Sequence, residues 1–164
     1  MIVGVAVVGI AIGVFVFLYG GENFSNNPPP VPIENLAAVE VPFTELASGT
    51  QSNIKKRTNY LITSIYGLEE LWKLVDTKRK MPDIDFNKNY VIAVFAGQNP
   101  TSGYAISVSK VEDAQNRVVT ITLISPGTSC VLAQSKTAPY QIIELSKTSL
   151  LFTHEDKATV SECK

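Results

Sequence analysis

The chain has little of the material from which most catalytic and metal sites are built. Its 164 residues include one histidine and two cysteines, and 18% of them are charged. The H-E-x-x-H, C-x-x-C, P-loop and G-x-S-x-G patterns are all missing from the sequence. These absences disfavour a zinc protease, a thiol oxidoreductase, a nucleotide hydrolase and a serine hydrolase. We expect a noncatalytic protein that holds no metal and no cofactor.

Two residue pairs are weak exceptions to that expectation. Asp83 and Asp85 could act as an acid–base pair, but Pro-Asp-Ile-Asp before a strand is more simply turn chemistry. Cys130 could pair with His154 as thiol and imidazole, although nothing nearby in the sequence suggests an activated nucleophile. We therefore keep the prediction that the protein is not an enzyme.

Positive charge is also scarce. The chain has 14 Lys and Arg against 15 Asp and Glu, which gives a formal net charge of -1 at pH 7. The clusters at residues 55–57 and 78–80 are short and contain no aromatic residues, so they indicate solvated loops or helix ends. The sequence predicts no nucleic-acid partner.

The chain does have one long uncharged apolar run, Ile2–Tyr19. At about 1.5 Å per residue a helix of this length covers roughly 27 Å, close to the hydrocarbon core of a bilayer. At the end of the run, Leu18–Gly21 include large side chains where a signal cleavage site needs small ones, and no cysteine follows for a lipid anchor. We expect an uncleaved transmembrane anchor over residues 2–19, with a cleaved signal peptide as the alternative.

Charge around this run bears on its orientation. The first cation after it is Lys55, so no positive charge holds the downstream part on the cytoplasmic side. We expect a single-pass membrane protein with a cytoplasmic N-terminus and a soluble domain outside the cell or in the periplasm.

A proline-rich linker separates the run from the rest. Residues 20–32 contain Pro28–Pro30 and Pro32, and consecutive prolines form an extended spacer of about 3.1 Å per residue. A ligand for a proline-binding domain is the alternative. The remaining length suits one domain, which we place at residues 33–154, followed by a polar tail at 155–164.

Periodicity in this domain predicts mainly β-structure. Alternating or continuous apolar residues predict strands at 39–44, 58–65, 91–96, 104–111, 117–125, 140–145 and 150–152. Pro42 indicates an edge position for the first strand. Short polar turns between strands are typical of an antiparallel meander. We predict a mainly antiparallel domain of the α+β class with one packed helix.

The helix is predicted at residues 67–77. Leu68, Leu71, Trp72 and Val75 fall on one helical stripe. Acidic residues 69–70 suit its first turn and basic residues 78–80 its last turn. We interpret Trp72 as the residue that packs the helix on the sheet.

A loop between two of these strands is the candidate binding site, consisting of Asn99, Pro100, Thr101, Ser102, Gly103 and Tyr104. Asn99 can bond its own backbone, Pro100 fixes φ, and Gly103 supplies the positive φ that a sharp turn needs. We expect Thr101 and Ser102 at an exposed tip that joins adjacent antiparallel strands and contacts a partner. A hairpin turn without a binding role is the alternative.

Several short segments occur in a characteristic order: Met81–Phe86, Val91–Gly97, Thr101–Tyr104, Ser125–Gly127 and Ala138–Tyr140. That succession, over roughly residues 60–147, resembles the PrcB C-terminal-domain family, named after a subunit of a bacterial surface protease complex. The resemblance implies a noncatalytic extracytoplasmic module that associates with protein, a secreted or surface protease in the namesake case.

The loop also carries a second resemblance. Asn99–Tyr104 is similar to the N-P-T-T-G-Y/F loop with which chagasin-type inhibitors enter the active-site cleft of cysteine proteases. Ser102 replaces the usual second threonine, and Ala138–Tyr140 lacks the arginine and tryptophan of the downstream R-P-W motif. Cysteine protease inhibition is therefore the alternative function.

The two cysteines, Cys130 and Cys163, are expected to form a disulfide if the domain is extracytoplasmic, because that compartment lets disulfides persist. The bond would tie the polar tail to the turn region that follows residue 125. The alternative is a small buried Cys130 and a free terminal thiol at Cys163.

Overall fold

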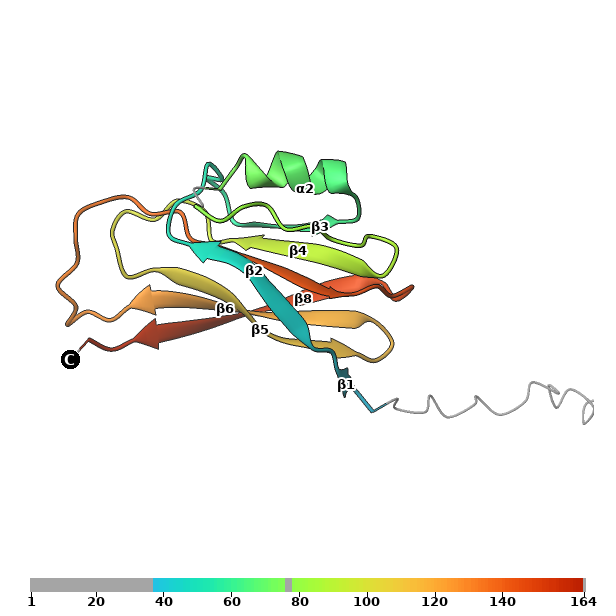
Figure 1. The fold of residues 1–164 in the computed structure, drawn as a ribbon. Coiled ribbons are helices and arrows are strands. Elements are labelled where there is room, and N and C mark those ends of the chain that lie inside the picture. Colours follow the sequence, from blue (N-terminus) through green and yellow to red (C-terminus); the bar gives the residue numbers. More distant parts are fainter. Residues whose placement is uncertain (1–36, 76–77, 164) are drawn as a thin grey trace, which may run out of the picture. The chain divides into compact units, whose positions relative to one another are not determined.

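Two four-stranded sheets pack face to face in the computed structural model, which describes residues 37–75 and 78–163. The central sheet has the order β2 (Phe43–Gly49), β7 (Tyr140–Ser146), β4 (Asn89–Phe95), β3 (Thr58–Ile62). The outer sheet has the order β1 (Val39–Glu40), β5 (Ala105–Asp113), β6 (Arg117–Pro126), β8 (Phe152–Ser161). Helix α2 (Ile65–Trp72) covers the face of the central sheet that is turned away from the outer sheet (Figure 1).

The central sheet is buried on both faces. In β4, Ile92 and Val94 pack toward the outer sheet, while Val91, Ala93 and Phe95 pack toward the helix. A strand covered on both faces needs a continuous apolar run, which is the pattern of this segment. The predicted strands at 91–96 and 140–145 are confirmed as β4 and its neighbour β7.

The helix is shorter than predicted and starts earlier. Ser64 caps it, since its Oγ accepts a hydrogen bond from the Gly67 N–H at 3.3 Å. Because the helix begins at Ile65, the acidic residues 69–70 lie beyond its first turn. Because it ends at Trp72, the basic residues 78–80 lie outside it, and the predicted charge pattern is wrong. Trp72 packs against the apolar cluster between helix and sheet, as expected.

The outer sheet departs from the predicted meander. β5 and β6 form an antiparallel hairpin, but β8 pairs with β6 in parallel, from Phe152 opposite Arg117 to Ser161 opposite Pro126. The predicted short strand at 150–152 and the predicted polar tail at 155–164 are therefore wrong, because most of this segment is one long strand. Over residues 37–75 and 78–163 the structure is mostly antiparallel with one short helix, as the α+β prediction states.

The predicted strand at 39–44 is two strands. Val39 and Glu40 pair with β5 in the outer sheet, and Phe43 begins β2 in the central sheet. Val41 lies between them with its side chain buried and its N–H bonded to the Val111 carbonyl at 2.8 Å. Pro42, which has no N–H to donate, falls in the gap where the chain changes sheets.

The predicted anchor Ile2–Tyr19 and linker Gly20–Pro32 lie outside the described residues. Within the part of the chain that the structure describes, no helix is long and apolar enough to cross a membrane. Leu36–Lys164 forms a compact unit that contains the eight strands of the described residues, both apolar clusters and a disulfide.

Candidate partner-binding surface

The loop predicted to bind a partner lies at one end of the sandwich. It leaves β4 in the central sheet and enters β5 in the outer sheet, so it crosses between layers (Figure 1). The prediction that it joins adjacent antiparallel strands is wrong, because the neighbours of β4 are β7 and β3. The two apolar strands therefore do not pair as a hairpin.

Two glycines shape this crossing. Gly97 has φ +81°, and a Cβ there would lie 2.9 Å from the Arg57 backbone nitrogen. Gly103 has φ +89°, and a Cβ there would lie 2.9 Å from Cβ of Pro126. Both positions combine a left-handed backbone with a close approach, which other residues do not tolerate. The predicted positive φ at Gly103 is confirmed.

A second loop, Gly127–Pro139, is fastened to the first by five hydrogen bonds, which together form a clasp. Asn99 and Thr137 exchange two backbone hydrogen bonds of 2.7 and 3.0 Å. The Ser102 N–H donates to the Ala133 carbonyl at 3.1 Å, and the Ala133 N–H donates to Ser102 Oγ at 3.0 Å. Thr137 Oγ1 donates to the Thr101 carbonyl at 2.9 Å. We call these two loops together the end surface.

The clasp changes the expected role of the loop tip. Thr101 and Ser102 are half-buried, and the Ser102 hydroxyl accepts a bond from the neighbouring loop. The Ser102 hydroxyl thus helps to hold the two loops together, while the Thr101 hydroxyl donates to the Ser102 carbonyl within its own loop at 3.1 Å. The prediction of an exposed tip is thus correct for Pro100, which is exposed, and wrong for the two hydroxyl residues.

The predicted disulfide is present and fastens the second loop to β8. Cys130 and Cys163 are bonded with their Cα atoms 5.1 Å apart. Beside the bond, the Gly127 N–H donates to the Ser161 carbonyl at 2.9 Å. The alternative of two unpaired thiols is wrong, and so is the imagined thiol–imidazole pair, because Cys130 has no thiol to offer His154.

The most exposed apolar side chain of the end surface is Val131, which is fully exposed. It lies between the disulfide at Cys130 and the hydrogen bonds at Ala133. Its neighbour Leu132 turns inward, with Cδ2 3.1 Å from where a Cβ on Gly103 would be. A fully solvated aliphatic residue on a doubly fastened loop can enter a pocket on a partner at low entropic cost. The sequence analysis missed Val131, and its position next to Cys130 was the one available signal.

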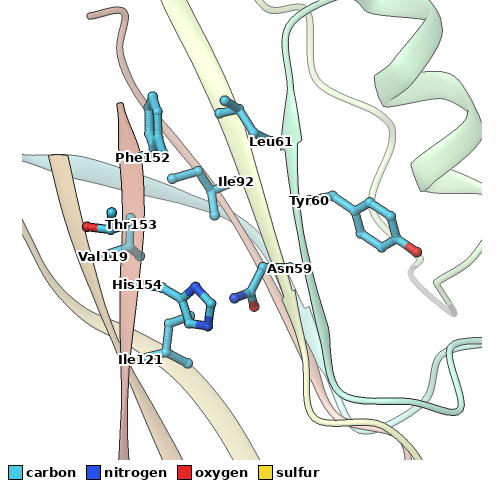
Figure 2. Close-up of a pocket in the computed structure, with 9 residues that line it drawn as sticks. All are labelled: Asn59, Tyr60, Leu61, Ile92, Val119, Ile121, Phe152, Thr153 and His154. Atoms are coloured by element: carbon cyan, nitrogen blue, oxygen red, sulfur yellow. The ribbon is translucent and has the colours of Figure 1, made fainter. Parts of the chain in front are cut away.

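A groove also opens between the sheets, on the side where β3 and β8 lie at the edges (Figure 2). It has a volume of about 180 Å³, and Ile92, Val119 and Ile121 form its apolar floor. His154 and Asn59 face each other across it (Figure 2). Its lining includes no carboxylate and no amine.

Other polar candidates have structural roles. Asp85 Oδ1 accepts the Asn87 N–H at 3.1 Å, and this bond, with Lys88 nearby, lowers the pKa of Asp85. This is the turn chemistry expected for the Asp83–Asp85 segment. Among residues 37–75 and 78–163, no group of three His, Cys, Asp or Glu side chains could hold a metal ion.

Comparison with known proteins gives one family. Residues 90–146 match the family model described as PrcB C-terminal. The matched segment runs from β4 through β7 and includes both loops of the end surface, whereas β8 lies beyond it. No curated protein and no solved structure matches the chain. The resemblance seen in the sequence is confirmed over residues 90–146, which are similar to the PrcB C-terminal family.

Proposed function

We propose that the chain is a noncatalytic binding module that associates with a protease or another surface protein complex. Ile2–Tyr19 would hold it at the membrane, and the domain would lie outside the cell or in the periplasm. The family resemblance supports association with a protease, since the family is named after a subunit of a protease complex. The Cys130–Cys163 bond supports an oxidising compartment.

The observation that carries this proposal is the clasped end surface. Its two loops are held by five hydrogen bonds between them and by the disulfide, so little freedom is lost when a partner binds. Val131 and Pro100 project from this fixed base. A buried aliphatic anchor surrounded by polar contacts is the usual arrangement of a protein interface.

Cysteine protease inhibition has less support. Ser102, which such a loop would present to a protease cleft, is half-buried and bonded to the neighbouring loop through both its N–H and its hydroxyl. Inhibition is tested with a papain-like protease at micromolar concentrations of the Leu36–Lys164 unit. Full protease activity would reject inhibition and leave association untouched.

Association is tested by immobilising the Leu36–Lys164 unit and passing over it an extract of its own cell envelope. We expect the retained material to contain a protease activity. Val131→Asp should remove most of it, because a charge would enter an apolar contact. Leu151→Asp is the matched control, since Leu151 is also an exposed aliphatic residue and precedes β8 at the opposite end of the sandwich.

The outcomes separate clearly. Loss of protease with Val131→Asp and retention with Leu151→Asp would support the proposed surface. Equal retention of protease by both variants would mean that the contact lies outside the end surface. Absence of any protease in the retained material would contradict association with a protease, and absence of any retained protein would contradict association altogether.

A further inference from the structure

Four strands lie at sheet edges in the described residues, and β8 differs from the other three. β1 has 2 residues and β3 has 5, while β2 is interrupted by a register shift between Glu45 and Ala47. These are common ways to prevent one sheet from pairing with another. β8 has 10 residues in continuous register and contains neither proline nor glycine. Its outer edge is a long regular row of backbone donors and acceptors.

The two faces of β8 follow from its register with β6. His154 and Asp156 lie beside Val119 and Ile121, which belong to the core, so even-numbered residues face inward. Thr153, Glu155, Lys157 and Thr159 therefore face solvent. All residues of the strand after Phe152 are exposed. Because β8 is exposed from Thr153 onward, another strand could approach that part of its edge without displacing a described strand or helix.

The order of these side chains is self-complementary about Asp156. In an antiparallel pair with a two-fold axis through Asp156, Glu155 of each copy stands opposite Lys157 of the other. Thr153 then stands opposite Thr159, and Phe152 opposite Val160, which is 58% exposed in the single chain. Opposite charges and apolar pairs directly across two strands each favour pairing.

We propose that a second copy of this chain pairs with β8 in this register and joins the two outer sheets into one continuous sheet. The interface is isologous, as expected for a two-fold dimer. Moving the axis by one residue would place Glu155 opposite Glu155, or Lys157 opposite Lys157. Like charges directly opposite are unfavourable, so the side chains select the register centred on Asp156.

Asp156 itself would stand close to its copy at the axis. An inward-pointing charge on an edge strand usually prevents pairing. Here Arg57 of the same chain neutralises it, with Nη2 2.7 Å from Oδ1 and Nε 3.0 Å from Oδ2. The pair is bidentate, so each Asp156 carries its own counter-ion into the interface.

The experiment is sedimentation equilibrium of the Leu36–Lys164 unit, at concentrations up to about 100 μM, where weak homodimers populate. We expect a dimer. Lys157→Glu and Glu155→Lys should each weaken it about tenfold or more, because two pairs of like charges replace two ion pairs. The double variant Glu155→Lys/Lys157→Glu should restore it, since it exchanges the partners of both pairs.

Lys80→Glu is the matched control, because it makes the same charge change at an exposed residue outside the sheets and should leave the dimer unchanged. The thermal unfolding of each variant shows whether it is folded. A monomer throughout the concentration range would overturn the proposal. A dimer whose dissociation constant is the same in the single charge variants would also overturn it. So would a dimer that the single variants weaken and the double variant does not restore. Pairing of β8 with a strand of a different protein in place of its copy would produce the first of these results.

Discussion

The central sheet and strand β8 are held in the molecule by different interactions. Ile142 and Ile143 of β7 are 0% exposed, each packed into one of the two apolar clusters. In β8 only Phe152 packs against the core, and the rest of the strand is held by the backbone pairing with β6, the Arg57–Asp156 ion pair and the disulfide. The central sheet therefore supplies much of the buried apolar packing, and β8 adds an edge exposed to solvent.

Truncation of a core residue should show the largest effect. Ile143→Ala is expected to lower the free energy of unfolding by about 4 kcal/mol, because it leaves a cavity between the sheets. Val160→Ala on β8 is the control and should cost less than about 0.5 kcal/mol. Urea denaturation of the Leu36–Lys164 unit measures both. Similar losses at the two positions would break the distinction between the regions.

Removal of the disulfide should come next. The bond closes a separation of 33 residues, and Cys130→Ala/Cys163→Ala is expected to cost about 3–4 kcal/mol by loop-closure entropy. Hydrogen exchange should rise mainly at the end of β8 and in the Gly127–Pro139 loop. A uniform rise throughout the central sheet would argue that β8 is part of one indivisible core.

A buried ion pair at the start of β6 should follow. Arg117 is 2% exposed, donates to Asp113 at 2.6 and 2.7 Å and to the Ser146 carbonyl, and lies 5.6 Å from the centre of the Phe152 ring. Asp113→Asn should cost about 3 kcal/mol, because it leaves a buried guanidinium without its counter-charge. Urea titration at neutral pH gives the value, and a loss below about 1 kcal/mol would contradict it.

The same pair predicts a pH dependence. Hydrogen bonds from Arg117 hold the pKa of Asp113 below its ordinary value of 3.8. The folded pKa is depressed, so this stability is fully present above pH 3.8 and is lost as pH falls through the lower folded value. We expect Asp113→Asn to flatten the acid limb of the stability profile. An unchanged acid limb would assign the acid sensitivity to other groups.

The smallest effect should come from the ion pair that touches β8. Asp156→Asn is expected to cost about 0.5–1 kcal/mol, because both partners are partly solvated. Thermal unfolding at low and high salt measures it, and the difference from the unmodified chain should shrink with salt. A loss above about 2 kcal/mol would mean that β8 depends on this pair more than on its backbone pairing.

How far the fold could be predicted from the sequence depends on whether a strand is buried or lies at an exposed edge. β4, β6 and β7 carry apolar patterns that their burial requires, so periodicity predicted them. β8 is polar on both faces because it is an exposed edge, and without an apolar pattern it looked like a tail. The change of sheet between β4 and β5 was missed because the local sequence does not specify which strands pair.

The candidate site was predictable to a similar degree. Gly103 and the Cys130–Cys163 pair were predicted from local conformation and compartment, which act through few residues. The exposure of Val131 depends on hydrogen bonds between Ser102 and Ala133, residues far apart in the chain. The burial of Arg117 likewise depends on three strands meeting around it. No local pattern contains such information.

The central functional claim is that the clasped end surface contacts the partner. Hydrogen exchange of the Leu36–Lys164 unit, free and bound to the protease that it retains, tests this most directly. We predict slower exchange on binding in Gly97–Tyr104 and around Val131, with no change in the β5–β6 turn at Ala114–Asn116. Slower exchange confined to that turn, or to helix α2, would contradict the account.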